Sequence, residues 1–323
     1  MTSPSVQTVT VDPADAEIRL DRWFKRHYPT LAHGRLEKLL RTGQIRLDGK
    51  RAESSDRIAA GQAIRIPPLD LPSSTAPLPP KPRSERENRM VATLKKLILH
   101  RDDDILVINK PPGLAVQGGT GTYEHLDGML DELRFGHSER PRLVHRLDRD
   151  TSGVLVLARH AQSATRLAAA FRDRSMEKIY WAIVVGVPTP RSGKIDKPLA
   201  KEAGPSGRER VAVGAVDAKR AVSHYRVIDS VAKQAALLEL IPITGRTHQL
   251  RVHCAAIGAP ILGDGKYGGP GAFLPGADVT NQLHLHARSL TLPRHGAPPL
   301  TLVAPPPAHF ASACRWLGLD PQA

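Results

Sequence analysis

Residues 143–157 read LVHRLDRDTSGVLVL, in which two apolar runs enclose a cluster of charged side chains. Thr151, Ser152 and Gly153 follow the charges, and these residue types permit a tight turn with side-chain hydrogen bonds to backbone amides. The second apolar run has the composition of a buried strand. A single aspartate before a strand is usually only a turn or capping residue. Here a polar loop enters an apolar strand at the rim of the core, and such a loop can fix one carboxylate rigidly while leaving it facing a cleft.

The chain on both sides of this stretch mixes strands and helices. Apolar runs predict strands at 105–110, 154–159, 180–186, 221–228, 234–241 and 283–292. Helical spacing predicts helices at 161–174, with Leu167, Ala168 and Phe171 inward, at 247–258 and at 309–318. Two of the strands follow each other so closely that a hairpin is favoured. The expected fold is therefore α+β, with a mixed sheet rather than a purely parallel one.

A proline-rich segment divides the chain. Residues 67–89 read PPLDLPSSTAPLPPKPRSERENR, and prolines and small polar residues dominate them. Such a composition is typical of a semi-extended, solvated tether rather than of a core. We therefore expect a small module at 1–66, a linker at 67–89 and a larger domain at 90–323.

The small module is patterned and basic. GRLEKLLRTG predicts a helix with its leucines on one face, and QIRLDGKR and GQAIRIP predict short strands, the first with a turn at Asp48-Gly49. Residues 16–66 contain 12 Lys and Arg against 6 Asp and Glu, a net +6. A basic helix alone is more often a solvated face, but a basic helix, turn and strand in one compact unit favour RNA binding. The candidate RNA contacts are Arg35, Lys38, Arg41, Arg46 and Lys50.

The composition restricts the partners and the compartment. Lys and Arg number 46 against 32 Asp and Glu among 323 residues, a formal net charge of +14 that favours nucleic acid over an anionic membrane surface. No apolar run reaches about 18 residues, so no membrane-spanning helix is expected, and the N-terminus shows no signal-peptide pattern. The two cysteines, Cys254 and Cys314, predict neither a disulfide framework nor a zinc cluster and favour a reduced cytosolic compartment.

Three further stretches carry polar residues at the ends of predicted elements. LIPITGRTHQLRVH places Arg246 between a strand and a helix, although this pattern is equally that of a helix start with a charged, solvated face. MEKIYWAIVVG opens a strand with Tyr180, which in isolation is more often a core residue. ILVINKPPGLAVQGG ends a buried strand at Lys110, beside a rigid Pro-Pro-Gly loop.

Together these motifs resemble the pseudouridine synthases of the ribosomal large-subunit type. HRLDRDTSG matches the signature of that family and places Asp148 at the position of its essential aspartate, and NKPPG, KIYWA and TGRTHQLRVH occur in the family's order. The resemblance covers almost the whole chain, because the front module resembles the small RNA-binding module first named for a small-subunit ribosomal protein. It implies an α+β catalytic domain with a mixed, mostly antiparallel sheet, preceded by a small α/β RNA-binding module.

The resemblance also implies a reaction. A cytoplasmic, monomeric isomerase would convert uridines to pseudouridine in large-subunit ribosomal RNA or its precursor particle, with no metal, cofactor or membrane involved. Asp148 would act as the nucleophile or stabilise the cationic sugar, and Arg246 would pair with it, because an adjacent cation favours the ionised carboxylate. Tyr180 would stack on the flipped uracil. The alternatives are a synthase acting on other ribosomal sites or on transfer RNA, and a non-catalytic RNA-binding assembly factor.

Further residue roles follow from the resemblance. Arg146 would fill the space that the flipped base leaves, a task that suits a planar guanidinium. Lys110 would bind RNA, and Leu250 would line the substrate pocket. One position departs from the pattern: Gln117 stands where a related enzyme usually has a histidine, which leaves the choice of target open.

Two other patterns are not expected to form sites of their own. GDGKYG (263–268) has the GxGxxG spacing but does not lie between a strand and a helix, so a dinucleotide site is not expected; in the family this stretch resembles a loop beside the active site. His284 and His286 alternate along a strand without a carboxylate or cysteine to complete a ligand set. We expect them to be surface or RNA-facing histidines.

Overall fold

The chain divides into two compact units, Met1–Pro82 and Arg83–Ala323, which are described separately. The computed structural model describes residues 6–69, 84–118, 124–173, 175–203, 209–214, 217–276, 279–294 and 296–322. Most of the expected linker, residues 70–83, lies outside the described residues. Residues 85–89, which we also assigned to the linker, instead form the first turn of a helix, because the Ser84 hydroxyl accepts from the Glu87 amide in a capping box.

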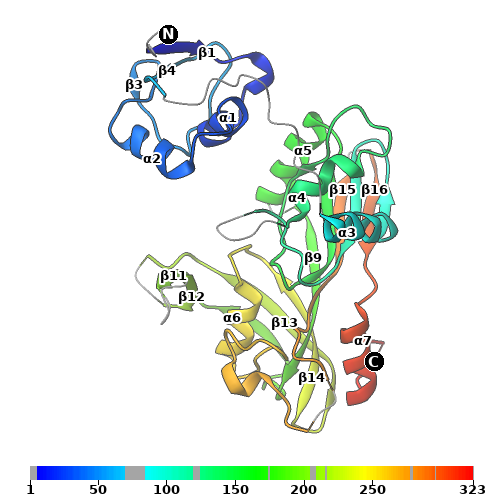
Figure 1. Cartoon of the computed structure of the whole chain (residues 1–323). Helices are drawn as coiled ribbons and strands as arrows, with labels where there is room; N and C mark the ends of the chain where they lie inside the picture. The colour runs from blue at the N-terminus through cyan, green and yellow to red at the C-terminus, as the bar shows by residue number, and fades with distance from the viewer. Residues whose placement is uncertain are drawn as a thin grey trace. The chain divides into compact units, whose positions relative to one another are not determined.

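The first unit consists of two helices and a small antiparallel sheet (Figure 1). The helices are α1 (Leu20–His27) and α2 (His33–Arg41), and the strands β1 (Gln7–Thr10), β2 (Arg46–Leu47), β3 (Lys50–Arg51) and β4 (Ala63–Ile66) pair in the order β1-β4-β2-β3. The turn at Asp48-Gly49 joins β2 to β3 with positive φ at both residues, 49° and 75°, as predicted. Trp23, Phe24 and the leucines of α2 fill the core.

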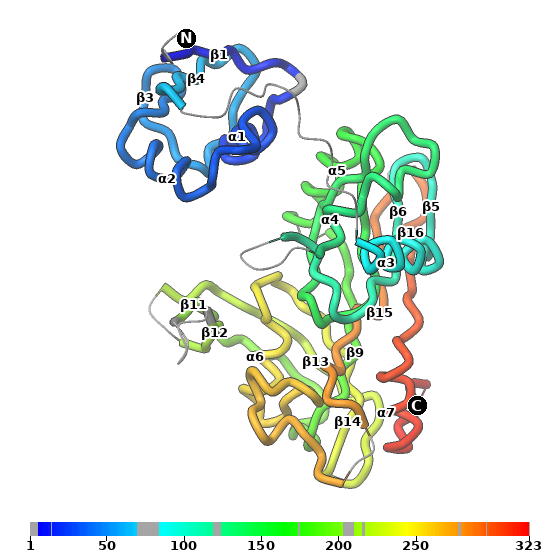
Figure 2. Tube along the Cα trace, viewed as in Figure 1, coloured from blue at the N-terminus to red at the C-terminus, as the bar shows by residue number. Residues whose placement is uncertain are grey.

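The second unit contains a ten-stranded sheet within its described residues (Figure 2). The order is β10-β13-β14-β9-β15-β8-β6-β5, with β16 on β15 and β7 on β8. The strands are β5 (Ile98–Arg101), β6 (Ile105–Lys110), β7 (Arg142–Leu143), β8 (Ser152–Ala158), β9 (Glu177–Val185), β10 (Ser192–Asp196), β13 (Val222–Val231), β14 (Ala235–Pro242), β15 (Leu285–Arg294) and β16 (Ala297–Val303). Only β8 and β15 pair in parallel among the described strands. The expected mixed, mostly antiparallel sheet is confirmed.

Alternating side chains send the strands' apolar residues to both faces of the sheet. On β6, Leu106 and Ile108 pack against α3 (Glu85–Lys96) and α4 (Leu126–Met129), whereas Ile105 and Val107 face the side of α5 (Ala161–Arg172). On β9, β14 and their neighbours, one face carries α6 (Gln249–Ala256) and the other α7 (Ala308–Leu317). Tyr180 packs against the apolar cluster that includes α3 and α4 and against the cluster that includes α6. The α3–α4 cluster and the α6 cluster therefore meet at this residue.

Smaller elements complete the second unit. A two-stranded hairpin, β11 (Leu199–Ala203) with β12 (Glu209–Val213), stands apart from the main sheet (Figure 1), and short 3-10 helices lie at Leu130–Leu133 and Gly269–Ala272. On α5, Leu167 is buried and Phe171 half-buried as predicted, but Ala168 is exposed, because Ala164 instead completes the inward stripe. No helix in the described ranges is long and apolar enough to cross a membrane.

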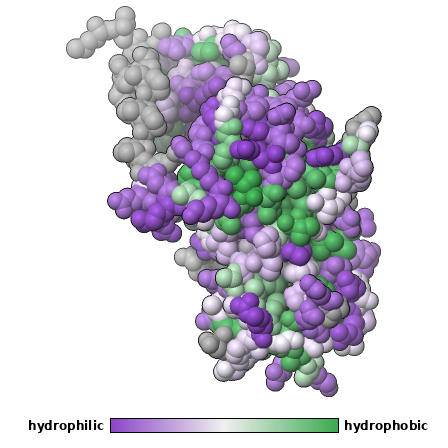
Figure 3. All heavy atoms as spheres, turned by 90° about the vertical axis from the view of Figure 1, so that its right-hand side faces the viewer, coloured by the Kyte–Doolittle hydropathy of each residue, from purple (hydrophilic) through white to green (hydrophobic). Residues whose placement is uncertain are grey.

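Hydrophobic residues also reach the surface of the molecule. On the face turned to the viewer in Figure 3, they gather in a central patch with hydrophilic residues around it. The large apolar side chains that are most exposed in the second unit include Trp316 on α7 and Val303 on β16. Both cysteines are buried, and burial raises the pKa of the Cys254 thiol to about 12.

Candidate active site

The loop that carries Asp148 is held to the sheet at several points. Leu147 is buried in the core, and the Thr151 amide donates to the Asp148 carbonyl across 3.2 Å, which closes a turn. His145 Nε2 accepts from the Val156 amide of β8 at 2.8 Å, and burial lowers the pKa of this imidazole to about 3, so it remains neutral. The Asp148 side chain retains 22 % of its exposure. One carboxylate thus reaches solvent from a fixed backbone, as the sequence predicts.

Gly153 is required where this loop enters β8. Its φ is 113°, and a Cβ built there would overlap the Ala287 carbonyl of the neighbouring strand β15. The two residues face each other in the parallel pair of β8 and β15. A side chain at residue 153 would therefore displace the start of β8, and with it the Asp148 loop.

Lys110 does not have the role that we predicted for it. Its side chain is fully buried, and Nζ donates to the carbonyl oxygens of Pro111, Leu114 and Arg149, each at 2.9 Å. All three donors of an ammonium are then used inside the protein, so direct contact with RNA is excluded in this structure. Burial lowers the pKa of Lys110 to about 7, although the charges of Asp150 and Asp148 oppose that shift. From inside the core, Lys110 thus holds the residue after Asp148 through its hydrogen bond to the Arg149 carbonyl.

Tyr180 lies on β9 where the two clusters of that face meet. Burial raises the pKa of its phenol, and the negative charge of Asp148 raises it further, so the hydroxyl keeps its proton at neutral pH. The charge of Asp148 therefore acts on this phenol. The joint catalytic role of Asp148 and Tyr180 stays a prediction.

Arg246 does not form the expected ion pair with Asp148. Both residues are described, and the exposed guanidinium of Arg246 instead donates from Nε to the Arg220 carbonyl at 3.3 Å. The basic side chain closest to the carboxylate is His248, whose Nε2 lies 3.9 Å from Asp148 Oδ1. Sequence reasoning noted His248 only as one of several basic residues near Arg246. The structure selects it because the backbone turns at residue 248 before α6 begins.

The turn before α6 is fixed by Gln249. Its Oε1 accepts from the Thr244 hydroxyl at 2.7 Å and from the Arg246 amide at 3.1 Å, and its Nε2 donates to the Val222 carbonyl and the Ser223 hydroxyl, both at 2.9 Å. The helix begins at Gln249, two residues after the predicted start, because His248 has left-handed backbone angles. The GRTHQ segment is therefore a structured turn and not a frayed, solvated helix end.

The loop 263–268 forms the next wall of the site, as the resemblance implied. Asp264 accepts two hydrogen bonds from the buried Arg251 guanidinium, at 2.6 and 2.8 Å. Tyr267 contacts the imidazole of His248, with 2.6 Å between Oη and Nδ1. Local pattern did not single out Tyr267 or Asp264 as site residues, and the one signal was the resemblance of GDGKYG to a loop beside the active site in the family.

The predicted RNA contacts fall into two groups. Arg146 is exposed on the Asp148 loop. In the first unit, Arg35, Lys38 and Arg41 lie on the exposed face of α2, and Arg46 and Lys50 are exposed on the β2–β3 hairpin. These positions allow contact with RNA, and their role stays a prediction. Leu250, predicted to line the substrate pocket, is 7 % exposed and packs in the α6 cluster.

His284 and His286 are not surface histidines. Both are fully buried, and burial lowers the pKa of each imidazole to about 4. His286 Nδ1 lies 2.9 Å from the Ser152 hydroxyl, and its Nε2 lies 3.0 Å from the Ala304 carbonyl, so it joins β15 to β8 and to the residue that follows β16. The prediction was wrong because the strand that carries them is interior. Among the described residues, no group of three or more His, Cys, Asp or Glu is placed to hold a metal.

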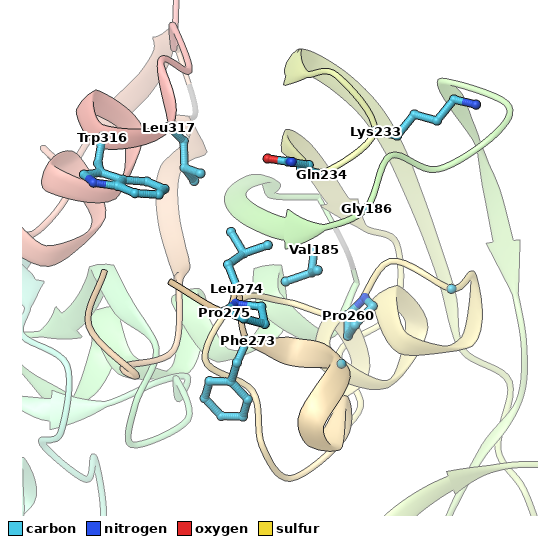
Figure 4. A pocket seen from close by; sticks show the side chains of 12 residues that line it. Val185, Gly186, Lys233, Gln234, Pro260, Phe273, Leu274, Pro275, Trp316 and Leu317 are labelled. Atoms are coloured by element: carbon cyan, nitrogen blue, oxygen red, sulfur yellow. The ribbon is translucent and has the colours of Figure 1, made fainter. Parts of the chain in front are cut away.

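A separate groove of about 590 Å³ lies at the far end of β9 (Figure 4). The carboxyl end of β9, the β13–β14 turn, the segment 258–275 and α7 line it, and Trp316 and Leu317 of α7 lie across it from Leu274. Among its described lining residues are neither Asp148 nor Tyr180. The groove is therefore not part of the site described above.

Comparisons with known proteins agree with this geometry. A family model described as RNA pseudouridylate synthase matches residues 104–256. "RNA pseudouridine synthase 4, mitochondrial" of Arabidopsis thaliana is 36% identical and covers 84% of this chain, with 70% of its own length matched. Proteins named "Ribosomal large subunit pseudouridine synthase C" from Rickettsia conorii and Vibrio vulnificus are 34% and 35% identical, over 85% and 81% of this chain and 88% and 80% of their own lengths.

Solved structures show the same fold. "Human RNA Pseudouridylate Synthase Domain Containing 4" superposes with a TM-score of 0.61 at 33% identity, over 73% of this chain and 98% of the other. "Human RNA Pseudouridylate Synthase Domain Containing 1" superposes with a TM-score of 0.53 at 24% identity, over 70% of this chain and 96% of the other.

Proposed function

Because the chain belongs to the RNA pseudouridine synthase family and is an isomerase of that type, we propose that it modifies specific uridines of large-subunit ribosomal RNA through Asp148. The observation that carries the catalytic assignment is the fixed loop that presents one partly exposed carboxylate beside Tyr180 and His248. The names of the bacterial relatives support the choice of RNA. The substrate would be the free ribosomal RNA or its precursor particle.

The reaction breaks the bond from ribose to the ring nitrogen, turns the base and rejoins it through a ring carbon. A uridine inside folded RNA must first leave its stack, at a cost of about a few kcal/mol. Arg146, exposed on the same loop as Asp148, would fill the vacated space with its planar guanidinium. Asp148 would then act as nucleophile on the sugar or stabilise its positive charge. Either role requires the ionised carboxylate.

Two other residues would assist with the flipped base. Tyr180 offers its ring for stacking and a phenol that keeps its proton, so the hydroxyl is available as a donor. Arg246 remains a candidate catalytic residue because it lies two residues before His248, at the entrance to α6. It would act on bound RNA rather than through an ion pair already formed in the free protein. Leu250, on α6, would contribute the apolar floor of the pocket.

Binding of the RNA outside the site would rest on charge. The net +14 and the basic first unit support phosphate contacts that give affinity without sequence choice. We further propose that the protein acts as a monomer in the cytoplasm, although one relative carries a mitochondrial name. The chemistry assigned to these residues draws on no metal or cofactor.

Replacement of Asp148 tests the assignment. Asp148→Asn should abolish pseudouridine formation on protein-free large-subunit RNA while the melting temperature and RNA affinity remain those of the wild type. Asp103→Asn is the matched control, since Asp103 is an exposed carboxylate in the β5–β6 turn. Full activity of the Asp148 variant would refute the proposal. Mapping pseudouridines in cells with and without the gene would identify the target sites, including any in transfer RNA.

A non-catalytic role in ribosome assembly is the second candidate, favoured by the basic first unit. The two functions predict opposite results for Asp148→Asn in a deletion strain. If the variant restored every growth and assembly defect, RNA binding would be the function under selection. If the variant restored no pseudouridine and only part of the growth, catalysis would be the function under selection.

A further inference from the structure

His248 has a backbone conformation that histidine rarely adopts. Its φ and ψ are 52° and 19°, in the left-handed region that favours glycine or asparagine. Unfavourable backbone angles of this kind persist only where the surroundings impose them, and they are common at functional sites. Gln249 imposes the turn here through its buried hydrogen bonds to Thr244 and Arg246. The result is that the imidazole of His248 points toward Asp148.

The imidazole lies between two oxygen atoms. Nε2 is 3.9 Å from Asp148 Oδ1, and Nδ1 is 2.6 Å from Tyr267 Oη. The longer distance is just beyond a hydrogen bond, and such catalytic contacts are often long in a free enzyme and shorten when substrate binds. The side chains of His248 and Asp148 are similarly enclosed, with 21% and 22% of their area exposed. The short contact to Tyr267 therefore fixes the ring, and the longer one leaves room for movement of the carboxylate.

Tyr267 is itself held in place. Its Oη accepts from the Val211 amide of β12 at 3.4 Å. The Arg251 guanidinium lies 5.0 Å from the ring centroid, in cation–π range, and Arg251 is fixed by its two hydrogen bonds to Asp264. Arg210 lies over the same ring at 5.5 Å. A phenol with so many neighbours cannot turn away from His248 without breaking buried contacts.

The acceptors decide which nitrogen carries the proton. An ionised carboxylate can only accept, so a neutral imidazole that faces Asp148 favourably must carry its hydrogen on Nε2. Nδ1 then accepts from the Tyr267 hydroxyl, which is protonated because burial raises the pKa of that phenol. The Val211 amide occupies one lone pair of the same oxygen, which leaves its hydrogen free to point to Nδ1. The Val211 amide then donates to the Tyr267 hydroxyl, the hydroxyl donates to Nδ1 of His248, and Nε2 of His248 is left to donate to Asp148.

We propose that Tyr267 and His248 form a positioning pair for Asp148, in which Tyr267 holds the imidazole in place by donating to its Nδ1 and His248 orients the carboxylate through Nε2. Neither residue acts on the uracil. The neutral imidazole orients the carboxylate without cancelling its charge, which a cation in permanent contact would reduce. This inference rests on the proposed catalytic role of Asp148.

Charged groups from three segments face the imidazole. Burial lowers the pKa of His248, Arg251 of α6 and Lys266 lower it further, and Asp148 and Asp264 raise it, so that the pKa lies below 6.5. At neutral pH the ring is therefore uncharged. At pH values below its pKa the imidazole gains a proton and becomes a cation next to Asp148. The rate should therefore change with pH over the range in which the imidazole gains its proton.

Two single variants of the full-length protein test the pair. His248→Asn keeps a residue type that tolerates left-handed angles but cannot gain a charge, and Tyr267→Phe removes one oxygen. We expect each to lower the single-turnover rate on saturating RNA about 10–100-fold, as is usual for partners of a functional group, with RNA affinity unchanged. His224→Asn is the control, because His224 is exposed on β13. It should match the wild type throughout.

The pH profile separates positioning from a merely structural role. In His248→Asn this change of the rate with pH should be absent, because the asparagine side chain gains no proton. In Tyr267→Phe the imidazole remains, so the rate should fall while its change with pH is kept. A uniform loss of rate at all pH values together with a lower melting temperature in His248→Asn would overturn the inference. So would wild-type rates in both variants.

The two hypotheses fail in different ways. An active Asp148→Asn variant would refute the proposed function, whatever the other variants do. An inactive Asp148→Asn variant, combined with wild-type rates and profiles for His248→Asn and Tyr267→Phe, would refute only the positioning pair.

Discussion

The Lys110 ammonium donates a hydrogen bond to the Arg149 carbonyl across 2.9 Å, which joins the end of β6 to the residue directly after Asp148. The two other Nζ donors go to carbonyls of the Pro111–Leu114 loop. A single buried side chain thus connects the two loops whose sequences, NKPPG and HRLDRDTSG, carry the family resemblance. The position of Asp148 depends on this connection.

Removal of the ammonium should cost both stability and activity. Lys110→Met fills a similar volume but leaves three buried carbonyl oxygens without a donor, so we expect a loss of about 2 kcal/mol in the free energy of unfolding. Pseudouridine formation should fall about 10–100-fold, because the Asp148 loop loses its support. Urea unfolding and single-turnover assays measure the two effects. Lys95→Met, at an exposed position of α3, should change the free energy of unfolding by less than about 0.5 kcal/mol. Equal stability of the two variants would contradict the structural role.

The same residue should make stability depend on pH. Burial lowers the pKa of Lys110 from 10.5 to about 7. Between these two values the unfolded chain binds a proton that the folded protein does not, so the free energy of unfolding should rise with pH relative to Lys110→Met. The excess of the wild type over the variant should therefore grow from about pH 7 upward and level off near 10.5. A difference that does not change with pH would show that the folded Lys110 keeps its ordinary affinity for protons.

Gly153 should tolerate no side chain. Gly153→Ala places a Cβ against the Ala287 carbonyl at a φ of 113°, so we expect a loss of at least about 2 kcal/mol in the free energy of unfolding. Gly34→Ala is the control, since a Cβ there meets nothing within 4 Å and lies in α2. That substitution should be neutral or stabilise by about 0.5–1 kcal/mol. Chemical denaturation of both proteins decides the matter, and a neutral Gly153→Ala would contradict the close approach of β8 and β15.

The basic face of α2 should contribute affinity for RNA but not chemistry. Charge reversal of Arg35, Lys38 and Arg41 to Glu should weaken binding and flatten its dependence on salt, by about 0.7–0.9 in slope for each phosphate that the protein no longer neutralises. The rate at saturating RNA should remain that of the wild type, because α2 lies in the first unit and Asp148 in the second. Binding titrations at several salt concentrations measure the slope. An unchanged affinity would show that this face is only solvated surface.

The sequence predicted six strands and three helices of the second unit because their apolar residues form runs or helical stripes that are mostly interior. It did not predict α3, α4, β5, β7, β10, β11, β12 or β16. The predicted bounds of β6 match those observed, and α5 and α7 begin within one residue of their predicted starts. The first unit was predicted for a similar reason, since the Asp48-Gly49 turn fixes the β2–β3 hairpin locally. The start of α6 was placed two residues early, because the left-handed turn at His248 depends on the distant partners of Gln249.

The residues of the site show where local pattern stops being informative. Turn-forming residues before a buried strand predicted a rigid loop that carries carboxylates, but the choice of Asp148 came from the match of HRLDRDTSG to the family signature. The side chain of Lys110 is long enough to reach either solvent or the core, and one of its three acceptors, the Arg149 carbonyl, lies 39 residues away. The expected pair of Arg246 with Asp148 failed for the same reason.

The sequence by itself determined the α+β fold, the two-part organisation, the basic character and a carboxylate-bearing loop before a buried strand, because turn chemistry, apolar periodicity and charge act over a few residues. Only the tertiary structure decided that His248 faces Asp148, that Tyr267 holds His248, and that Lys110 lies behind the loop. These contacts join segments far apart in the chain, and their partners are chosen by the packing of α6 and the loops against one face of the sheet.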